Sequence, residues 1–161
     1  AYLGAIDRAA HTWNGHRSPR NESMYLPGGH AYVYFTYGNH YCLNVVCGRT
    51  DEGVAVLIRA LEPTEGLDAM FIHRPKAKFE TDLCSGPGKL TQALQIDRSL
   101  DGIDLRTSGE LFIEQVRNRP LKPAAILTTP RIGLNPTPDW PGDWHTRPLR
   151  FCIKGSRFVS R

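Results

Sequence analysis

The sequence contains no long apolar run, although 40% of its 161 residues are hydrophobic. Since a helix that crosses a bilayer needs about 20 consecutive apolar residues, we expect no membrane span. The four cysteines form no Cys-x-x-Cys pair, and the six histidines have no metal-ligand spacing. These absences predict reduced thiols, no bound metal and a location inside the cell. No repeat, targeting peptide or interior domain boundary appears, so residues 1–161 are expected to form a single domain.

The charge of the chain is modest and positive. The net charge is +4 and the isoelectric point is about 9.0, values that permit a polyanionic partner without requiring one. The basic residues gather in two groups, which are Arg74, Lys76 and Lys78, and then Arg147, Arg150, Lys154, Arg157 and Arg161. Each group is equally compatible with an ordinary solvated surface.

Residues 32–41 hold four of the six tyrosines. This run alternates as a strand does, reaches a Gly-Asn turn and alternates again, which predicts a β-hairpin with strands 31–37 and 40–47. Aromatic side chains on such a hairpin can stack on nucleic-acid bases or wedge between them, but strands that face a core also favour tyrosine. A connection with an odd number of residues would place Tyr34 directly opposite Asn44, whereas a two-residue connection would place them on opposite faces.

Strands outnumber helices in the rest of the pattern. The predicted elements are strands at 54–61, 110–114, 124–129 and 149–153, helices at 5–13, at 64–73 with Thr64 as N-cap and after Lys89, and loops at 14–30, 74–83 and 135–144. The fold class is therefore predicted to be α+β: a single domain with a curved, mostly antiparallel β-sheet, a protruding β-hairpin and flanking short helices.

Four features have both a functional and a structural interpretation. Arg59 interrupts an apolar strand, so it must be paired or line a polar pocket, unless it lies at a strand end and reaches solvent. The loop Ser85–Lys89 precedes a helix and its backbone N–H groups can bind phosphate, although it lacks the Walker spacing. Tyr37 lies at the hairpin tip with little core to bury into, which favours an interaction role. His11 lies among apolar residues of a short predicted helix and, taken alone, is expected to be structural.

Several blocks in colinear order carry a resemblance to a known family. They are Ala1-Tyr2-Leu3-Gly4, Ala9-Ala10-His11, Ser18-Pro19-Arg20-Asn21, Tyr32-Val33-Tyr34 with Tyr37-Gly38 and Asn44, Leu57 to Pro63, Leu83 to Pro87, Arg131-Ile132-Gly133 and Arg147 to Phe151. Together they resemble the alkyladenine DNA glycosylase family, also called the 3-methyladenine DNA glycosylase family. That family flips an alkylated purine out of duplex DNA and hydrolyses its N-glycosidic bond in base-excision repair.

The resemblance implies a role for particular residues. In the base site, Tyr2 would stack on one face of the flipped base and His11 and Tyr34 on the other. Asn44 would obstruct the 2-amino group of normal guanine, and Tyr37 would enter the minor groove as a wedge. Arg59 and the backbone carbonyl of Ile132 would position the attacking water. The residues that would contact DNA beside the wedge are Gly38, Arg20, Gly86 and Lys89.

The same resemblance implies a monofunctional enzyme that uses water and needs no metal or organic cofactor. Its partner would be double-stranded DNA with damaged purines, and the chain is expected to act as a monomer. In the family a Glu that activates water immediately precedes the Ala-Tyr-Leu-Gly block, and Asp7 lies too far along to replace it. The domain is therefore expected to lack its N-terminal segment. This keeps a non-catalytic damaged-DNA-binding module as an alternative, whereas an RNA-binding sheet is disfavoured because the RRM signature is absent.

Overall fold

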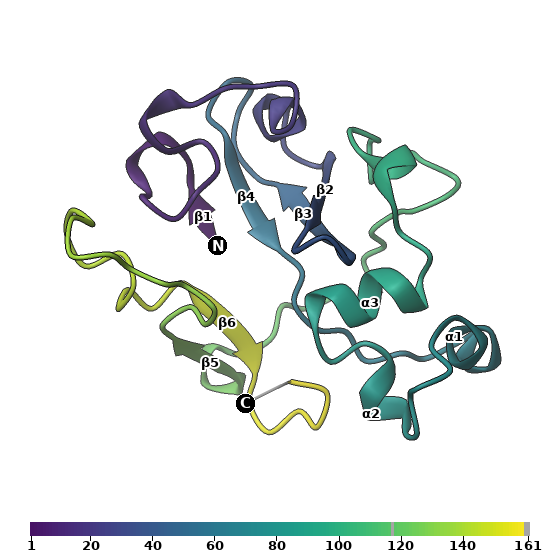
Figure 1. Cartoon of the computed structure of the whole chain (residues 1–161). Coiled ribbons are helices and arrows are strands. Elements are labelled where there is room, and N and C mark those ends of the chain that lie inside the picture. Colours follow the sequence, from purple (N-terminus) through teal and green to yellow (C-terminus); the bar gives the residue numbers. More distant parts are fainter. Residues whose placement is uncertain (117, 160–161) are drawn as a thin grey trace.

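The alternating apolar stretches of the sequence form two antiparallel sheets in the computed structural model, which describes residues 1–116 and 118–159 (Figure 1). The larger sheet has the strand order β1-β4-β3-β2, and the smaller sheet pairs β5 with β6. The strands are β1 (Tyr2–Leu3), β2 (Ala31–Thr36), β3 (His40–Val46), β4 (Val54–Leu57), β5 (Ile126–Thr129) and β6 (Arg150–Ile153). The helices are α1 (Leu67–His73), α2 (Glu80–Leu83) and α3 (Pro87–Ala93), and the short 3-10 helices are Gly4–Ile6, Trp13–Gly15, Glu22–Tyr25, Arg98–Leu100 and Pro123–Ala125.

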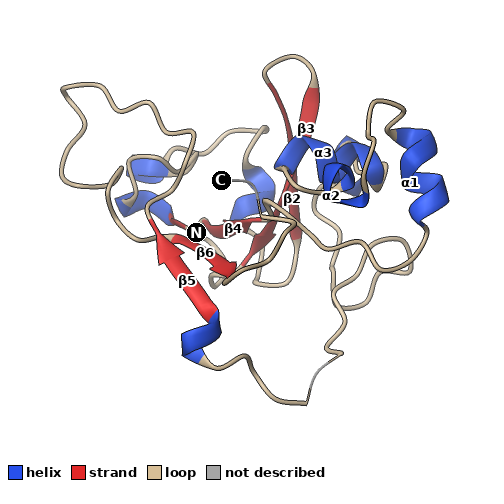
Figure 2. Ribbon diagram, turned by 90° about the horizontal axis from the view of Figure 1, so that it is seen from below, coloured by secondary structure: helices blue, strands red, loops and turns tan. Residues whose placement is uncertain are grey.

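The tyrosine-rich run forms the predicted hairpin, which projects beyond the rest of the molecule in Figure 2. The connection has three residues, since Thr36 pairs with His40. An odd connection places Tyr34 and Asn44 on the same face, as predicted for that case. The predicted direct pairing of Tyr34 with Asn44 is wrong, however: the register is shifted by two residues, and Asn44 lies opposite Tyr32.

Alternation along the hairpin separates the two faces of the larger sheet. One face packs against the three helices in the main core, whose buried members are Ala31, Val33, Leu43, Leu83, Cys84, Leu90, Ala93, Ile96 and Leu105. The other face carries a smaller cluster of Met24, Tyr32, Val46 and Ala55, with Tyr34 packed beside it. Because tyrosines occupy the second face, its polar groups are available for a site while the first face supplies the bulk of the buried apolar surface.

Helix α3 is held against strand β3 at very close range. A Cβ at Gly88 would lie 2.5 Å from His40 Cδ2, so only glycine fits at that contact. One turn later the Thr91 hydroxyl donates a hydrogen bond to the Tyr41 carbonyl at 2.9 Å. The N-terminal end of α3 is thereby placed beside the hairpin. The predicted helix is confirmed, with Leu90 and Ala93 buried, but it begins at Pro87, so Pro87 to Lys89 belong to the helix and not to the loop before it.

The predicted helix at 5–13 is wrong. The segment forms 3-10 turns because the Asp7 carboxylate accepts hydrogen bonds from the backbone N–H groups of Leu3 (3.1 Å) and Ala9 (3.0 Å). A short polar side chain that satisfies nearby backbone donors competes with helical hydrogen bonding. The hydrophobic periodicity of the segment did not reveal this competition.

Three other predicted boundaries differ from the structure. Strand β4 ends at Leu57 instead of residue 61, because the chain leaves the sheet and the Leu61 N–H bonds to the Cys84 carbonyl at 3.1 Å. Helix α1 begins at Leu67, after Gly66 in a left-handed conformation, so Thr64 is not its N-cap. The predicted loop at 74–83 contains the short helix α2.

The C-terminal part of the chain confirms two predicted strands and contradicts a third. Strands β5 and β6 pair from Ile126–Ile153 to Thr129–Arg150, while residues 110–114 form no strand. In that segment Leu111 packs on the main core and the Ile113 N–H bonds to the Leu105 carbonyl. The predicted loop at 135–144 has neither helix nor strand.

The cysteines are free thiols, as predicted, but not all of them are in the core. Cys42 and Cys84 are buried, whereas Cys47 is exposed and Cys152 is half-buried. Within the described part of the chain, no helix is long and apolar enough to cross a membrane. Arg161, the last of the predicted basic residues, lies outside the described residues.

Candidate functional site

A small cavity opens on the tyrosine-bearing face of the larger sheet. Its volume is about 40 Å³, room for a few water molecules. It is lined by Tyr2, Ala9, His11, Met24, Tyr32, Tyr34 and Asn44. All four residues that the sequence assigned to the base, Tyr2, His11, Tyr34 and Asn44, therefore meet in one place although they come from separate segments of the chain. Tyr32 and Met24 complete the lining and were not assigned a role from the sequence.

The aromatic side chains in this cavity are held in fixed relative positions. Tyr32 and Tyr34 stack with ring centroids 5.2 Å apart, and the His11 ring meets Tyr34 edge-on at 4.6 Å. A hydrogen bond of 2.7 Å joins His11 Nδ1 and the Tyr32 hydroxyl. The contacts of His11 with the two tyrosines agree with the predicted structural role, but its ring also lines the cavity.

The cavity keeps its aromatic groups uncharged at neutral pH. Burial first, and then the positive charge of Arg20, lower the pKa of His11 to about 4. Burial also raises the pKa of the Tyr32 and Tyr34 hydroxyls. His11 as a whole residue is nevertheless exposed to solvent. A cationic or neutral base can therefore meet this ring without repulsion from an imidazolium.

The orientation of the Asn44 amide is fixed by the hairpin. The side chain is buried, and Nδ2 donates a hydrogen bond to the Tyr32 carbonyl across the strand pair at 3.1 Å. Because only the NH₂ end of the amide can donate to a carbonyl, the Oδ1 end is the one turned away from Tyr32. The side chain is thus a rigid wall of the cavity.

Tyr37 is the most exposed large hydrophobic residue in the described part of the chain, with 84% of its surface accessible. Its backbone is in the left-handed region (φ 50°), as is that of Gly38 (φ 69°), and the Asn39 N–H bonds to the Thr36 carbonyl at 3.3 Å. Two positive φ values in the central positions form the tight turn that matches strand twist. Glycine adopts this conformation freely, but a tyrosine pays for it in strain. The turn presents the ring outward at the tip.

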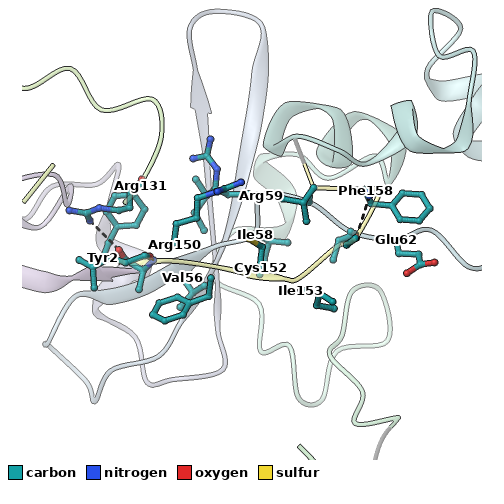
Figure 3. Close-up of a pocket in the computed structure, with 18 residues that line it drawn as sticks. Tyr2, Val56, Ile58, Arg59, Glu62, Arg131, Arg150, Cys152, Ile153 and Phe158 are labelled. Carbon is teal, nitrogen blue, oxygen red and sulfur yellow. Dashed lines mark hydrogen bonds between the residues drawn. The ribbon is translucent and has the colours of Figure 1, made fainter. Parts of the chain in front are cut away.

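A larger cavity of about 310 Å³, which Tyr2 also lines, lies between the segment that follows β4 and strand β6. Arg59 lines it, together with Arg131 and Arg150. Figure 3 shows Tyr2 and Arg131 at one end of this cavity and Glu62 at the other. Arg59 therefore comes after the end of strand β4, as in one of its two interpretations, and lines a cavity, as in the other. Ile132 is next to the lining residue Arg131 but does not line the cavity itself.

The most deeply buried ion pair of the described residues was not predicted from the sequence. The Arg131 guanidinium binds the Asp7 carboxylate through two hydrogen bonds of 2.5 and 2.9 Å, and neither side chain is more than 4% exposed. Arg131 also donates to the Trp144 carbonyl at 3.0 Å and lies 5.0 Å from the centre of the Tyr2 ring. Both carboxylate oxygens of Asp7 are thus engaged by Arg131, and no spacing in the sequence links two residues 124 positions apart.

The other predicted DNA-contact residues lie near the hairpin. Arg20 stands over the Tyr34 ring at 5.6 Å and donates weakly to the Phe35 carbonyl at 3.4 Å. Gly86 precedes helix α3, and Lys89 in its first turn donates to the Ser85 hydroxyl at 3.2 Å. In the described part of the chain, no group of three or more His, Cys, Asp or Glu side chains could hold a metal ion.

Comparison with known proteins gives consistent matches over nearly the whole chain. Two relatives named "Putative 3-methyladenine DNA glycosylase" come from Burkholderia lata and Methanoculleus marisnigri. The first is 47% identical over 160 residues, covering 99% of this chain and 73% of the relative, and the second is 48% identical over 166 residues, covering 100% and 79%. The DNA-3-methyladenine glycosylase of Mus musculus is 41% identical over 168 residues, which span 99% of this chain and 49% of the mouse protein.

These matches and the aromatic cavity define the class: the chain is a DNA glycosylase, a hydrolase of base-excision repair. The sequence model of the methylpurine-DNA glycosylase family matches residues 1–157, and the chain belongs to that family. The family, class of activity and DNA partner expected from the sequence are thereby confirmed. The roles of individual residues stay predictions.

Proposed function

We propose that this chain flips an alkylated or deaminated purine out of duplex DNA and holds it in the aromatic cavity while water cleaves the N-glycosidic bond. The observation that carries the proposal is the convergence of Tyr2, His11, Tyr34 and Asn44 on that cavity. Tyr2 would stack on one face of the base, and His11 with Tyr34 on the other.

The physics of base flipping favours damaged purines in such a site. Unstacking a base costs a few kcal/mol, and the cost is least for a damaged or mismatched pair. Electron-poor or cationic bases also stack well on aromatic faces. Since the closed cavity of about 40 Å³ is smaller than a purine, Tyr2 and His11 must move apart when the base enters. Side-chain movements of this size are common on binding.

The projecting hairpin supports a wedge role for Tyr37. Its exposed ring and left-handed backbone place a bulky aromatic group where it has no contact with the core. In the complex it would fill the space left by the flipped nucleotide, with Gly38 against the groove. The residues that would hold the DNA backbone nearby are Arg20, Gly86 and Lys89.

Arg59 and the Ile132 carbonyl would position the attacking water beside the N-glycosidic bond of the flipped nucleotide. The location of Arg59 in the larger cavity supports this assignment. The Glu62 carboxylate lies at the opposite end of that cavity from Tyr2, so it is not placed to act on the same water (Figure 3). Cleavage by water, without a lysine Schiff base, leaves the DNA strand intact. The chain would act as a monomer, inside the cell where the DNA is.

The test measures binding and base release together. Duplexes that carry hypoxanthine, 1,N6-ethenoadenine or normal adenine at one position are incubated with the chain. We expect tighter binding of the two lesion duplexes, release of free lesion base and no strand break. Equal binding of all three duplexes would contradict the proposal. Tight lesion binding without any base release would indicate a damaged-DNA-binding module instead.

A further inference from the structure

The buried Asp7–Arg131 pair lies directly behind the proposed stacking surface. Of the residues that line the two cavities, only Tyr2 belongs to both. Arg131 lines the larger cavity and not the smaller one, and its guanidinium carbon is 5.0 Å from the centre of the Tyr2 ring. Tyr2 therefore stands between the lining of the base pocket and the guanidinium.

Such an arrangement puts a buried positive charge close to any base in the small cavity, whereas Arg20 over the Tyr34 ring is exposed and its charge is screened by water. A base stacked on the Tyr2 ring lies about 3.5 Å from it, so the guanidinium would be roughly 8–9 Å from the base. At this separation, inside a protein, an unbalanced charge changes the binding of a cation about tenfold or more. The Arg131 guanidinium would also attract the π-electrons of the Tyr2 ring, and a cationic base stacked on that ring depends on the same electrons.

Asp7 cancels this charge. Its carboxylate is 0% exposed and holds the guanidinium through two hydrogen bonds, while the Leu3 and Ala9 backbone N–H groups bind the same carboxylate. The pair is therefore neutral as a whole and fixed in place. A merely structural link between the loop at Arg131 and the N-terminal segment would not need a charged pair, since apolar side chains of similar volume often serve as well.

We infer that the Asp7–Arg131 pair determines lesion specificity: by neutralising Arg131 behind Tyr2, Asp7 allows the cavity to accept purines that carry a positive charge as well as neutral ones. This inference rests on the proposed function and concerns residues that do not touch the base. A purine alkylated at N7 is cationic in DNA, whereas hypoxanthine is neutral, so the two lesions separate the effect of charge from that of stacking.

The experiment compares the affinity of two duplexes for each variant. One carries 7-methylguanine on a 2′-fluoro sugar, which slows loss of the base, and the other carries hypoxanthine. Asp7→Asn is expected to weaken binding of the cationic lesion about tenfold more than binding of hypoxanthine. The double variant Asp7→Asn/Arg131→Gln, which has neither charge, is expected to restore the wild-type ratio of the two affinities.

A second single variant keeps the test decisive if Asp7→Asn does not fold by circular dichroism. Arg131→Gln leaves the Asp7 carboxylate alone and, at pH 8, is expected to shift the ratio the opposite way, in favour of the cationic lesion. Asp51→Asn is the matched control, because it makes the same change in an exposed ion pair with Arg17, and it should leave the ratio unchanged.

The outcomes also separate this inference from the proposed function. If the wild-type chain prefers lesion duplexes but the variants weaken both lesions equally, with no restoration in the double variant, the pair is only structural and the inference is overturned. If the wild-type chain binds neither lesion better than undamaged duplex, the proposed function itself fails.

Discussion

At the scale of the residue, Tyr37 is held out of the molecule by its own backbone. The left-handed conformation costs about 1 kcal/mol or more for a side chain of this kind, and no core contact of the ring offsets it, since 84% of the side chain is exposed. Tyr37→Ser is expected to weaken lesion-duplex binding by about 1–3 kcal/mol, the usual worth of base–aromatic stacking. Undamaged duplex offers no gap to fill, so its affinity should change little.

Both affinities are measured by titration, alongside a thermal melt of the free protein. The melting temperature should not fall, because the exposed ring has no core contact to lose and the backbone conformation is equally strained with serine. Equal losses on damaged and undamaged DNA would show that Tyr37 is a general DNA contact.

Asn44 is a residue whose position was expected and whose orientation was not. Its hydrogen bond to the Tyr32 carbonyl holds the amide rigidly against the cavity. Stacking between aromatic faces does not distinguish one purine from another, so rejection of guanine requires a group placed against it. Asn44→Ala is expected to raise binding and excision of 1-methylguanine relative to hypoxanthine. The same ratio as in the wild type, with a lower melting temperature, would restrict Asn44 to a structural role.

His11 makes stability depend on pH. Its pKa is about 4 in the folded chain and about 6.5 in the unfolded one. Between these pH values the unfolded state binds more protons than the folded state. The contribution of neutral His11 to the unfolding free energy is therefore complete above about pH 6.5 and is lost as the pH falls from 6.5 to 4. With allowance for the solvent exposure of His11, the loss should be about 1–2 kcal/mol.

Urea denaturation at pH 7.5, 5.5 and 4.5 measures this slope. His11→Gln should flatten it, whereas the exposed control His145→Gln should not. An unchanged slope in His11→Gln would mean that another group titrates.

At the scale of the element, strand β2 owes its position to a side chain far along the sequence. The Asp101 carboxylate accepts hydrogen bonds from the Val33 N–H at 2.8 Å and from the Ser23 hydroxyl at 2.6 Å. Arg98 donates to the Val33 carbonyl at 2.8 Å. This contact covers the outer edge of the strand between Tyr32 and Tyr34, so an edge open to solvent is avoided.

Asp101→Ala is expected to lower the unfolding free energy by about 2–3 kcal/mol, because it leaves the Val33 N–H and the Ser23 hydroxyl without their partner. The control is Asp143→Ala, which removes only an exposed ion pair with Arg147 and should cost less than about 1 kcal/mol. Denaturation midpoints and slopes measure both. Similar losses of unfolding free energy in the two variants would show that the Asp101 contact stabilises the fold no more than an exposed ion pair does.

Elements with strong local signals matched their predictions most closely. The hairpin strands begin and end within one residue of the predicted limits, because alternation and a turn sequence specify a hairpin locally. Helix α3 followed from its apolar spacing, but its start at Pro87 was not predicted, although proline is common in the first turn of a helix. The helix predicted at 5–13 failed because its backbone is bound by Asp7, whose buried position depends on Arg131.

At the scale of the whole molecule, binding to DNA should depend on salt through a few basic contacts. The net charge is only +4, so a moderate slope of log affinity against log salt concentration is expected. Lys89→Ala should reduce that slope by about 1 on damaged and undamaged duplexes alike, since a phosphate contact carries no sequence information. The exposed control Lys122→Ala should leave it unchanged. A loss confined to lesion duplex would place Lys89 at the base instead.

The sequence by itself determined the fold class, the hairpin with Tyr37 at its tip and the family, because alternation, turn residues and colinear blocks are local properties of the chain. Only the tertiary structure decided which tyrosine lies opposite Asn44, since register depends on one residue in the turn. It also decided that Asp7 and Arg131 meet behind Tyr2. Partners 124 residues apart are brought together by packing of the whole chain, and no local spacing encodes such a contact.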